Sequence, residues 1–366
     1  AGSYLHSFAK SDFDDLCELL IGIPDEIGER PILLAASDEM AIFVADYYER
    51  LAQHYRIGQN GCELVRNLAD KKRMFEVAGE HDVPAPATFL PDNLEQAREF
   101  AKEVGYPLML KGVMGNKLFA RVGKKMAVVR DETELADEFT LMEDPDDKNL
   151  MIQELIPGDD DQVFIFNGFF DANSDCLVGF TGRKIRQFPV HVGCASLGEC
   201  TWDQDLYDLT TNFMKAIGYR GILDIGYRKD PRDGAFKVLD INPRVGQAFR
   251  IFVDEANYDS VRAMYVYLTE QEQPEQSVAR EGRRWLIEDF DAISSLHYRQ
   301  EGTLTFGEWL RSFRRVEEGA WFAWKDPVPF FVMSRAFITK MIRWLGKSIA
   351  RRVRGSNGAT EQTPSW

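Results

Sequence analysis

The sequence has few cysteines for its 366 residues, and they form no recognisable pattern. There are five, an odd number, and no pair has the CxxC spacing, so neither a disulfide framework nor a zinc site is expected. Free cysteines suit a reducing compartment, and the sequence therefore predicts a cytoplasmic protein. The five are Cys17, Cys62, Cys176, Cys194 and Cys200.

Two further features are missing, a long apolar run and an excess of positive charge. No apolar run reaches the roughly 20 residues that cross a bilayer, and no signal peptide opens the chain. The net charge is −15, so non-specific binding to a nucleic-acid backbone is not expected. The opening residues "AGS" are expected to be a truncation or a cloning scar.

Hydrophobic residues make up 45% of the chain, enough for a large core and for more than one domain. Residues 32–36 predict a buried strand, followed by a helix with Asp38 as its N-cap. Strands and helices then alternate from about residue 70 to residue 252, which predicts the α+β class. The predicted strands are 106–113, 124–130, 150–158, 161–170, 221–228 and 236–242, and the predicted helices begin near 68, 93, 131 and 205.

The turn signal "DPRDG", residues 230–234, predicts a hairpin between the last two strands. A hairpin centred on Arg232 places Asp224 opposite Asp240, with Cβ atoms about 4.5–5.5 Å apart. Alternation puts Asn242 on the same face as Asp240. Two carboxylates and an amide oxygen in one patch favour Mg²⁺ completed by phosphate oxygens and water. The alternative is a solvated hairpin whose acids only face water.

Pro243 cannot continue a central strand, so the chain turns there and presents Arg244 beside the acids. This constellation resembles the ATP-grasp superfamily, in which a strand pair supplies an acid and then an acid-x-Asn to two Mg²⁺ ions. The second acid is more often Glu in that family, and here it is Asp240. The resemblance implies an ATP-grasp core at 69–268, after a partial small α/β domain at 1–68. A helical extension, opened by a polar linker, would occupy 269–366.

The resemblance implies two lysines that bind ATP. Lys111 would contact the α- and β-phosphates and precede a loop that covers them. Lys71, or its neighbour Lys72, would be the upstream lysine. Four basic residues of the loop would either cover phosphates or form an exposed basic surface, namely Lys117, Arg121, Lys124 and Lys125.

The same resemblance implies a hinge segment that binds the adenosine. Backbone groups of Glu154 and Ile156 would pair with the adenine edge, and Asp160 would accept hydrogen bonds from the ribose. Basic residues between this hinge and the hairpin would meet the γ-phosphate or an acidic substrate, with a charged outer face as the alternative. They are Arg183, Lys184 and Arg186.

The activity implied is carboxylate activation by ATP, through an acyl phosphate that an amine attacks. Arg244 and Mg²⁺, with Mn²⁺ as a substitute, would neutralise the developing charge. His191 would be a general base or a plain loop residue. Similar enzymes are carboxylate–amine ligases such as D-aspartate ligase and the carbamoyl-phosphate synthase large chain. The alternatives are a carboxylase that uses carboxyphosphate and a nucleotide-binding module without turnover. The implied partners are a small-molecule carboxylate and amine, with no nucleic acid.

Residues 337–355 predict a basic amphipathic helix, against the negative charge of the whole chain. One interpretation is that its apolar stripe docks on the acidic body or on the second subunit of a homodimer. The other is a peripheral contact with an anionic membrane. The final twelve residues have a disordered composition. The stripe comprises Ile338, Met341, Ile342, Leu345 and Ile349, with Phe337 and Trp344 along its edges.

Overall fold

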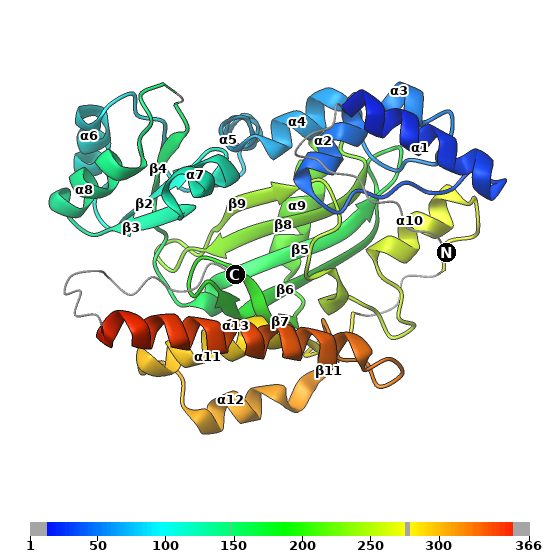
Figure 1. Cartoon of the computed structure of the whole chain (residues 1–366). Helices are drawn as coiled ribbons and strands as arrows, with labels where there is room; N and C mark the ends of the chain where they lie inside the picture. The colour runs from blue at the N-terminus through cyan, green and yellow to red at the C-terminus, as the bar shows by residue number, and fades with distance from the viewer. Residues whose placement is uncertain (1–12, 147, 275–278, 354–366) are drawn as a thin grey trace. The chain divides into compact units, whose positions relative to one another are not determined.

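The computed structural model describes residues 13–146, 148–274 and 279–353 (Figure 1). The opening "AGS" and the predicted disordered tail lie outside these residues. The chain forms two compact units, each built from three segments. The predicted domain boundaries after residues 68 and 268 both lie inside the first unit. The first unit comprises the residues up to Ala87, Ile156–Arg183 and Glu199–Gly282, and the second comprises Thr88–Leu155, Lys184–Gly198 and the residues from Arg283.

The N-terminal part of the first unit is helical, and the predicted strand at residues 32–36 is wrong. Only a single bridge forms there, between Ile32 and Arg56. Ala35 is buried against helices instead, so an apolar run that suggested a sheet is covered by α2 and α4. Ser37, not Asp38, accepts the capping hydrogen bond of α2. The helices are α1 (Phe13–Ile27), α2 (Asp38–Asp46), α3 (Tyr48–Leu51) and α4 (Cys62–Ala69).

The helix expected to begin near residue 68 starts at Lys71, immediately after α4 ends. The Asp70 side chain caps α5 (Lys71–Glu80) by accepting from the backbone N–H of Arg73. Because α5 begins at this cap, Lys71 is its first residue, where its side chain lies beside the strand pair described below. The cap therefore fixes the position of one predicted site residue.

Four antiparallel strands form the sheet of the first unit, in the order β6-β5-β8-β9 (Figure 1). Their buried side chains share one hydrophobic core with α4, α5 and α9. The strands are β5 (Val163–Phe170), β6 (Cys176–Phe188), β8 (Gly221–Lys229) and β9 (Phe236–Asn242). The remaining elements are α9 (Gln204–Ala216), α10 (Ser260–Leu268) and the short helices η1 (Asp160–Gln162) and η2 (Phe249–Ile251).

The second unit contains a separate antiparallel sheet in the order β1-β4-β2-β3. The segment expected to be a phosphate-covering loop contains helix α7 instead, because Leu118 is apolar and packs in the core of this unit. Asp131 caps α8, as predicted. The elements are β1 (Thr88–Phe89), α6 (Leu94–Val104), β2 (Leu108–Gly112), α7 (Gly115–Val122), β3 (Met126–Val129), α8 (Glu132–Met142) and β4 (Leu150–Glu154).

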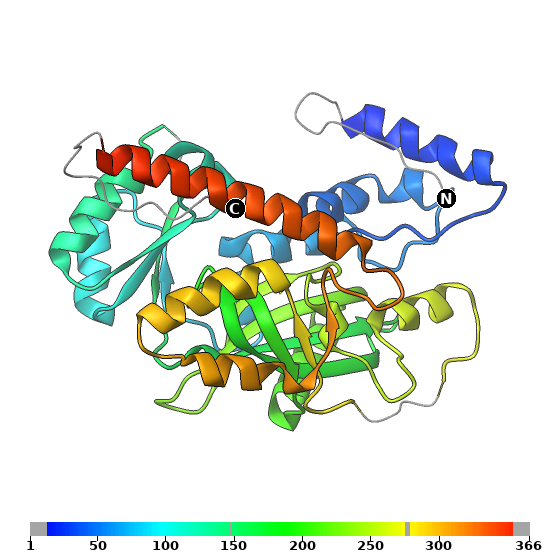
Figure 2. The same cartoon turned by 60° about the horizontal axis from the view of Figure 1, so that its bottom comes forward.

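The C-terminal segment adds strands and helices to the second unit (Figure 2). Within this unit its two strands lie in the order β11-β10-β7. The segment predicted as a helical extension therefore also contains two strands, β10 and β11. The elements are β7 (Cys194–Cys200), β10 (Arg284–Leu286), α11 (Glu288–Gln300), α12 (Phe306–Ser312), η3 (Phe313–Arg315), β11 (Val316–Gly319) and α13 (Val328–Val353).

Candidate active site

Strands β8 and β9 bring the two predicted acids and the amide to one face, although in a different register from the one expected. Asp224 lies opposite Asn242, and Asp240 lies opposite Gly226. The predicted pairing of Asp224 with Asp240 is therefore wrong. The turn pairs Lys229 with Phe236, and a bulge between Gly226 and Tyr227 shifts the register once more. Since alternation has period 2, all three polar side chains still share a face.

Close contacts hold this polar patch together. The Asn242 Nδ2 atom donates to Asp240 Oδ2 over 3.1 Å. Past the strand, Gly246 lies against Asp224 so closely that a Cβ added there would come within 2.8 Å of the Cβ of Asp224 and overlap its carboxylate. Only glycine fits at position 246 while Asp224 keeps its place.

Two cationic side chains of the same unit border the patch. The Lys71 ammonium forms an ion pair with Asp240. Burial lowers the pKa of Lys71 to about 8, with the Arg244 guanidinium acting in the same direction and the Asp38 and Asp70 carboxylates opposing it. Lys71 and Arg244, which are far apart in sequence, thus both border the polar patch, the lysine at Asp240 and the arginine at Asn242.

Arg244 is held by three acceptors within the first unit. Its Nε donates to Asp38 Oδ1 over 2.6 Å, one terminal nitrogen to Asn242 Oδ1 over 3.2 Å, and the other to the Val245 carbonyl over 3.0 Å. The exposed Asp38 carboxylate comes from the start of α2. Arg244 is therefore fixed beside the acids in one orientation.

The donor set of this patch suits a hard divalent cation. Asp224, Asp240 and Asn242 offer only oxygen ligands, the type that Mg²⁺ prefers. Within the described part of the chain, no group of three His, Cys, Asp or Glu side chains gathers as a metal site. Two carboxylates and an amide would thus hold such an ion only with further oxygens from a phosphate or from water.

The predicted hinge segment follows β4. Its residues Ile156 and Asp160 belong to the first unit, and both are buried. Ile156 is almost fully buried, and Asp160 is 8% exposed at the start of η1. The Arg228 guanidinium donates to the carbonyls of Pro157 and Asp159, each over 3.4 Å. A buried arginine of β8 therefore fixes the turn between the two predicted adenosine contacts.

Lys111 and Glu154 belong to the second unit, on neighbouring strands. The Lys111 Nζ atom donates to Gln153 Oε1 over 2.9 Å, and Gln153 Nε2 donates to Thr88 Oγ1 over 2.7 Å. Lys111 pairs with Met151, so Gln153 lies on the same face two residues further along β4. Glu154 is the half-buried last residue of β4. The lysine is thus oriented by a chain of hydrogen bonds across three strands.

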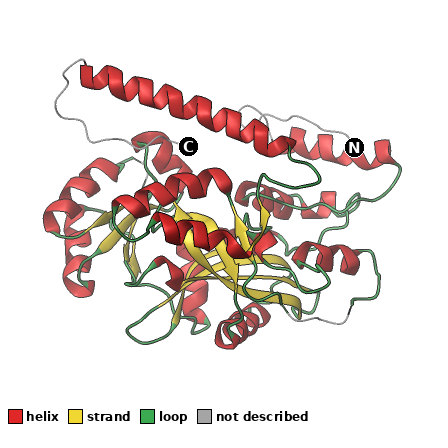
Figure 3. Ribbon diagram, turned by 90° about the horizontal axis from the view of Figure 1, so that it is seen from below, coloured by secondary structure: helices red, strands yellow, loops and turns green. Residues whose placement is uncertain are grey.

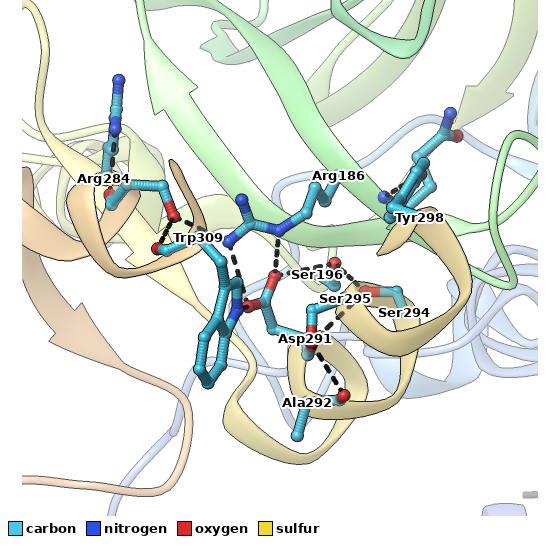
Figure 4. A network of polar contacts seen from close by, with 11 residues as sticks. Arg186, Ser196, Arg284, Asp291, Ala292, Ser294, Ser295, Tyr298 and Trp309 are labelled. Atoms are coloured by element: carbon cyan, nitrogen blue, oxygen red, sulfur yellow. Dashed lines mark hydrogen bonds and ion pairs between the residues drawn. The ribbon is translucent and has the colours of Figure 1, made fainter. Parts of the chain in front are cut away.

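The basic residues of β6 have different surroundings. Arg183 forms an ion pair with Glu199 at 3.0 Å, and Lys184 Nζ donates to the Gly193 carbonyl over 2.8 Å. Arg186 is only 3% exposed, and its guanidinium makes two hydrogen bonds to Asp291, of 2.7 and 3.0 Å (Figure 4). The structure therefore places Arg186 in a buried network of the second unit.

His191 and Asp291 make further polar contacts in the second unit. His191 Nε2 lies 3.0 Å from a Glu301 carboxylate oxygen. Asp291 also accepts from Ser196 and from Trp309 Nε1, at 3.3 and 2.9 Å (Figure 4). The carboxylate thus satisfies donors from β6, β7 and α12 at once.

Three residues that orient predicted site residues were not predicted from the sequence. They are Asp38, Gln153 and Asp291, which hold Arg244, Lys111 and Arg186 respectively. Only Gln153 had a local signal, because it lies two residues from the pairing partner of Lys111 on an adjacent strand. The other two contacts join segments 206 and 105 residues apart.

No protein-family model matches the chain. Among curated proteins it is similar to the D-aspartate ligase of Enterococcus faecium (strain Aus0004), with 25% identity over 236 residues, which cover 59% of this chain and 54% of that protein. It is 26% identical over 202 residues to the carbamoyl phosphate synthase large chain of Archaeoglobus fulgidus, covering 52% of this chain and 18% of that one. The chain thus spans about half of the first relative and less than a fifth of the second.

Solved structures share the fold. The ADP complex of N5-carboxyaminoimidazole ribonucleotide synthetase aligns with a TM-score of 0.58 and 13% identity, covering 75% of this chain and 68% of that one. Biotin carboxylase of Campylobacter jejuni, bound to a β,γ-ATP compound, aligns with a TM-score of 0.56 and 18% identity. The alignment covers 73% of this chain and 60% of that one. The chain is thus similar in sequence to part of these ligases and shares its α+β fold with these nucleotide-bound enzymes, as the resemblance to the ATP-grasp superfamily implies.

Proposed function

We propose that the chain is an ADP-forming ligase that activates a substrate carboxylate with ATP and joins it to an amine. One observation carries the proposal, the face of β8 and β9 on which Asp224, Asp240 and Asn242 gather with Arg244 beside them. The sequence relatives support it, since the similar protein of Enterococcus faecium is a D-aspartate ligase.

Each predicted ligand has its own role in this proposal. Asp224, Asp240 and Asn242 would hold Mg²⁺, or Mn²⁺ in its place, and the metal would supply neutralisation of phosphate charge. Lys71 and Lys111 would bind phosphate oxygens. Glu154, Ile156 and Asp160 are proposed to bind the adenosine, and Lys184 the γ-phosphate or an acidic substrate.

The chemistry needs no covalent nucleophile from the protein. An oxygen of the substrate carboxylate bonds to the γ-phosphorus, the bond from that phosphorus to the β,γ-bridging oxygen breaks, and ADP leaves. The amine nitrogen then bonds to the acyl carbon, phosphate leaves, and the nitrogen loses a proton. Arg244 would stabilise the charge that develops on the transferring group.

A screen of amino acids and amines tests the proposal, with ADP and phosphate release measured for each carboxylate–amine pair. We expect release only when both substrates and a divalent cation are present. Release driven by bicarbonate alone would instead indicate the carboxylase alternative. Nucleotide binding without release for any substrate would indicate a binding module and contradict the ligase.

Lys111→Ala is expected to weaken ATP binding roughly tenfold to a hundredfold, because it removes a charged hydrogen-bond donor. The measurement is a calorimetric titration with a non-hydrolysable ATP analogue. Lys102→Ala, at an exposed lysine on α6 of the same unit, should bind the analogue like the wild type. Unchanged affinity in Lys111→Ala would remove this lysine from the site.

Asp38→Asn is expected to lower kcat/KM for the carboxylate roughly tenfold, because Arg244 loses its charged acceptor. Affinity for the ATP analogue should stay unchanged, and Asp38→Glu should recover part of the loss. Glu49→Gln, at an exposed acid on α3, serves as the matched control. Equal kinetics for Asp38→Asn and wild type would show that the pair does not position Arg244 during catalysis.

We also propose a cytoplasmic location, a homodimer and a peripheral membrane contact through residues 337–355. In the described residues no helix has both the length and the apolar character needed to cross a bilayer.

A further inference from the structure

An aromatic turn precedes α13 and exposes large apolar side chains. Trp324 is 90% exposed at this turn, which a bridge between Ala323 and Asp326 closes. Val328, Phe331 and Val332, on the first turns of α13, are also exposed. Large apolar side chains that gather on one surface usually mark a contact with another molecule.

The turn is anchored to the body of the second unit, so Trp324 is presented on a fixed base. The Glu288 carboxylate accepts from the backbone N–H groups of Trp321 and Phe322, and Trp321 Nε1 donates to Asp289 over 3.1 Å. The Phe322 ring packs edge-on against Trp324 at 4.9 Å. Little conformational freedom therefore remains to be lost when Trp324 binds a partner.

The exposed apolar residues continue along α13, which Figure 3 shows as one long helix. Ile338 is 55% exposed and Ile342 is 64% exposed. Their spacing from Val328 and Phe331 repeats the helical period, so these residues share one side of the helix. Phe330 and Phe337 are only half-exposed. The two isoleucines of the predicted stripe are thus exposed on the helix.

The charge of α13 favours an anionic partner. Its sequence from Val328 to Val353 contains no acidic residue, whereas the whole chain has a net charge of −15. Arg335 and Lys340 are exposed on the helix. Its remaining turns add four more basic residues in sequence, namely Arg343, Lys347, Arg351 and Arg352.

We infer that Trp324 and the exposed apolar side of α13 bind the surface of an anionic lipid bilayer. Apolar residues would enter the interface while basic side chains meet lipid phosphates, and tryptophan is enriched at such interfaces. A second copy of the chain fits less well, because a two-fold contact would bring the same basic helix against itself. This contact with the bilayer is the peripheral membrane contact proposed above, with its centre at residues 324–342.

Co-sedimentation of the full chain with vesicles tests this inference, without ATP, so that its outcome is independent of ligase activity. We expect binding to phosphatidylcholine vesicles that contain phosphatidylglycerol, and release at about 0.5 M salt. Trp324→Ser and Ile338→Ser should each reduce binding roughly tenfold. Leu141→Ser, at a comparably exposed residue on α8, should bind like the wild type.

Three results would overturn the inference. One is a wild-type chain that stays in the supernatant with anionic vesicles at low salt. Another is unchanged binding of Trp324→Ser and Ile338→Ser. The third is a wild-type dimer in sedimentation equilibrium that Ile338→Ser dissociates, because the apolar side would then join two copies. Thermal unfolding of the variants checks that each exposed substitution leaves the fold intact.

Discussion

Asp240→Ala is expected to reduce substrate-dependent ADP release by roughly a hundredfold or more while the fold survives. The side chain shares one face with Asp224 and Asn242 and is half-exposed, so its removal changes ligand chemistry more than packing. Release should also lose its dependence on Mg²⁺ concentration, which a metal titration of the initial rate measures. Circular dichroism establishes that the variant is folded.

The matched control for this prediction is Asp205→Ala, at an exposed acid on α9 of the same unit. It removes one negative charge without touching β8 or β9, and its ADP release should equal that of the wild type. A folded Asp240→Ala protein with the wild-type rate and metal dependence would refute the metal-ligand assignment.

Asp291→Ala is expected to lower the free energy of unfolding of the protein by about 3–5 kcal/mol, the usual cost of leaving a buried charge unpaired. Arg186 is almost fully buried and makes both of its carboxylate contacts with this residue (Figure 4). The Trp309 indole and the Ser196 hydroxyl would lose the same acceptor. Urea denaturation followed by fluorescence measures the change.

A double variant separates the buried charge from the loss of side-chain volume. Arg186→Met with Asp291→Leu replaces both partners by apolar groups and should recover most of the stability. Asp289→Ala, a half-exposed acid on the same helix, should cost about 1 kcal/mol or less. A loss below about 1 kcal/mol in Asp291→Ala would contradict the assignment. If the folded double variant releases ADP at the wild-type rate, Arg186 has no catalytic role.

Sequence patterns predicted most elements of the fold because hydrophobic periodicity and caps are local. The hairpin of β8 and β9 and the Asp131 cap of α8 are confirmed. The prediction of a strand at residues 32–36 was wrong, because an apolar run does not reveal whether a sheet or helices will cover it. The predicted register of the hairpin was wrong because the turn pairs Lys229 with Phe236, and because a bulge, which has no signature in the alternation of β8 and β9, shifts the pairing once more.

The site was predictable to the extent that its residues are close in sequence. Asp240, Asn242 and Arg244 lie within five positions, and their strand partner Asp224 lies across a recognisable turn. Asp38 and Asp291 were not predictable as the partners of Arg244 and Arg186, because a polar residue at the start of a helix gives no hint of a partner 206 or 105 positions away.

The close approach of Gly246 to Asp224 has a consequence for recognising distant relatives. A chain that keeps the carboxylate of Asp224 in this place has no room for any side chain at position 246. The diagnostic pattern therefore extends beyond the acid-x-Asn of β9 and includes a glycine two positions after the arginine. A sequence with the acids but a larger residue there would have to displace the first carboxylate, and we expect it to have a remodelled or vestigial metal site.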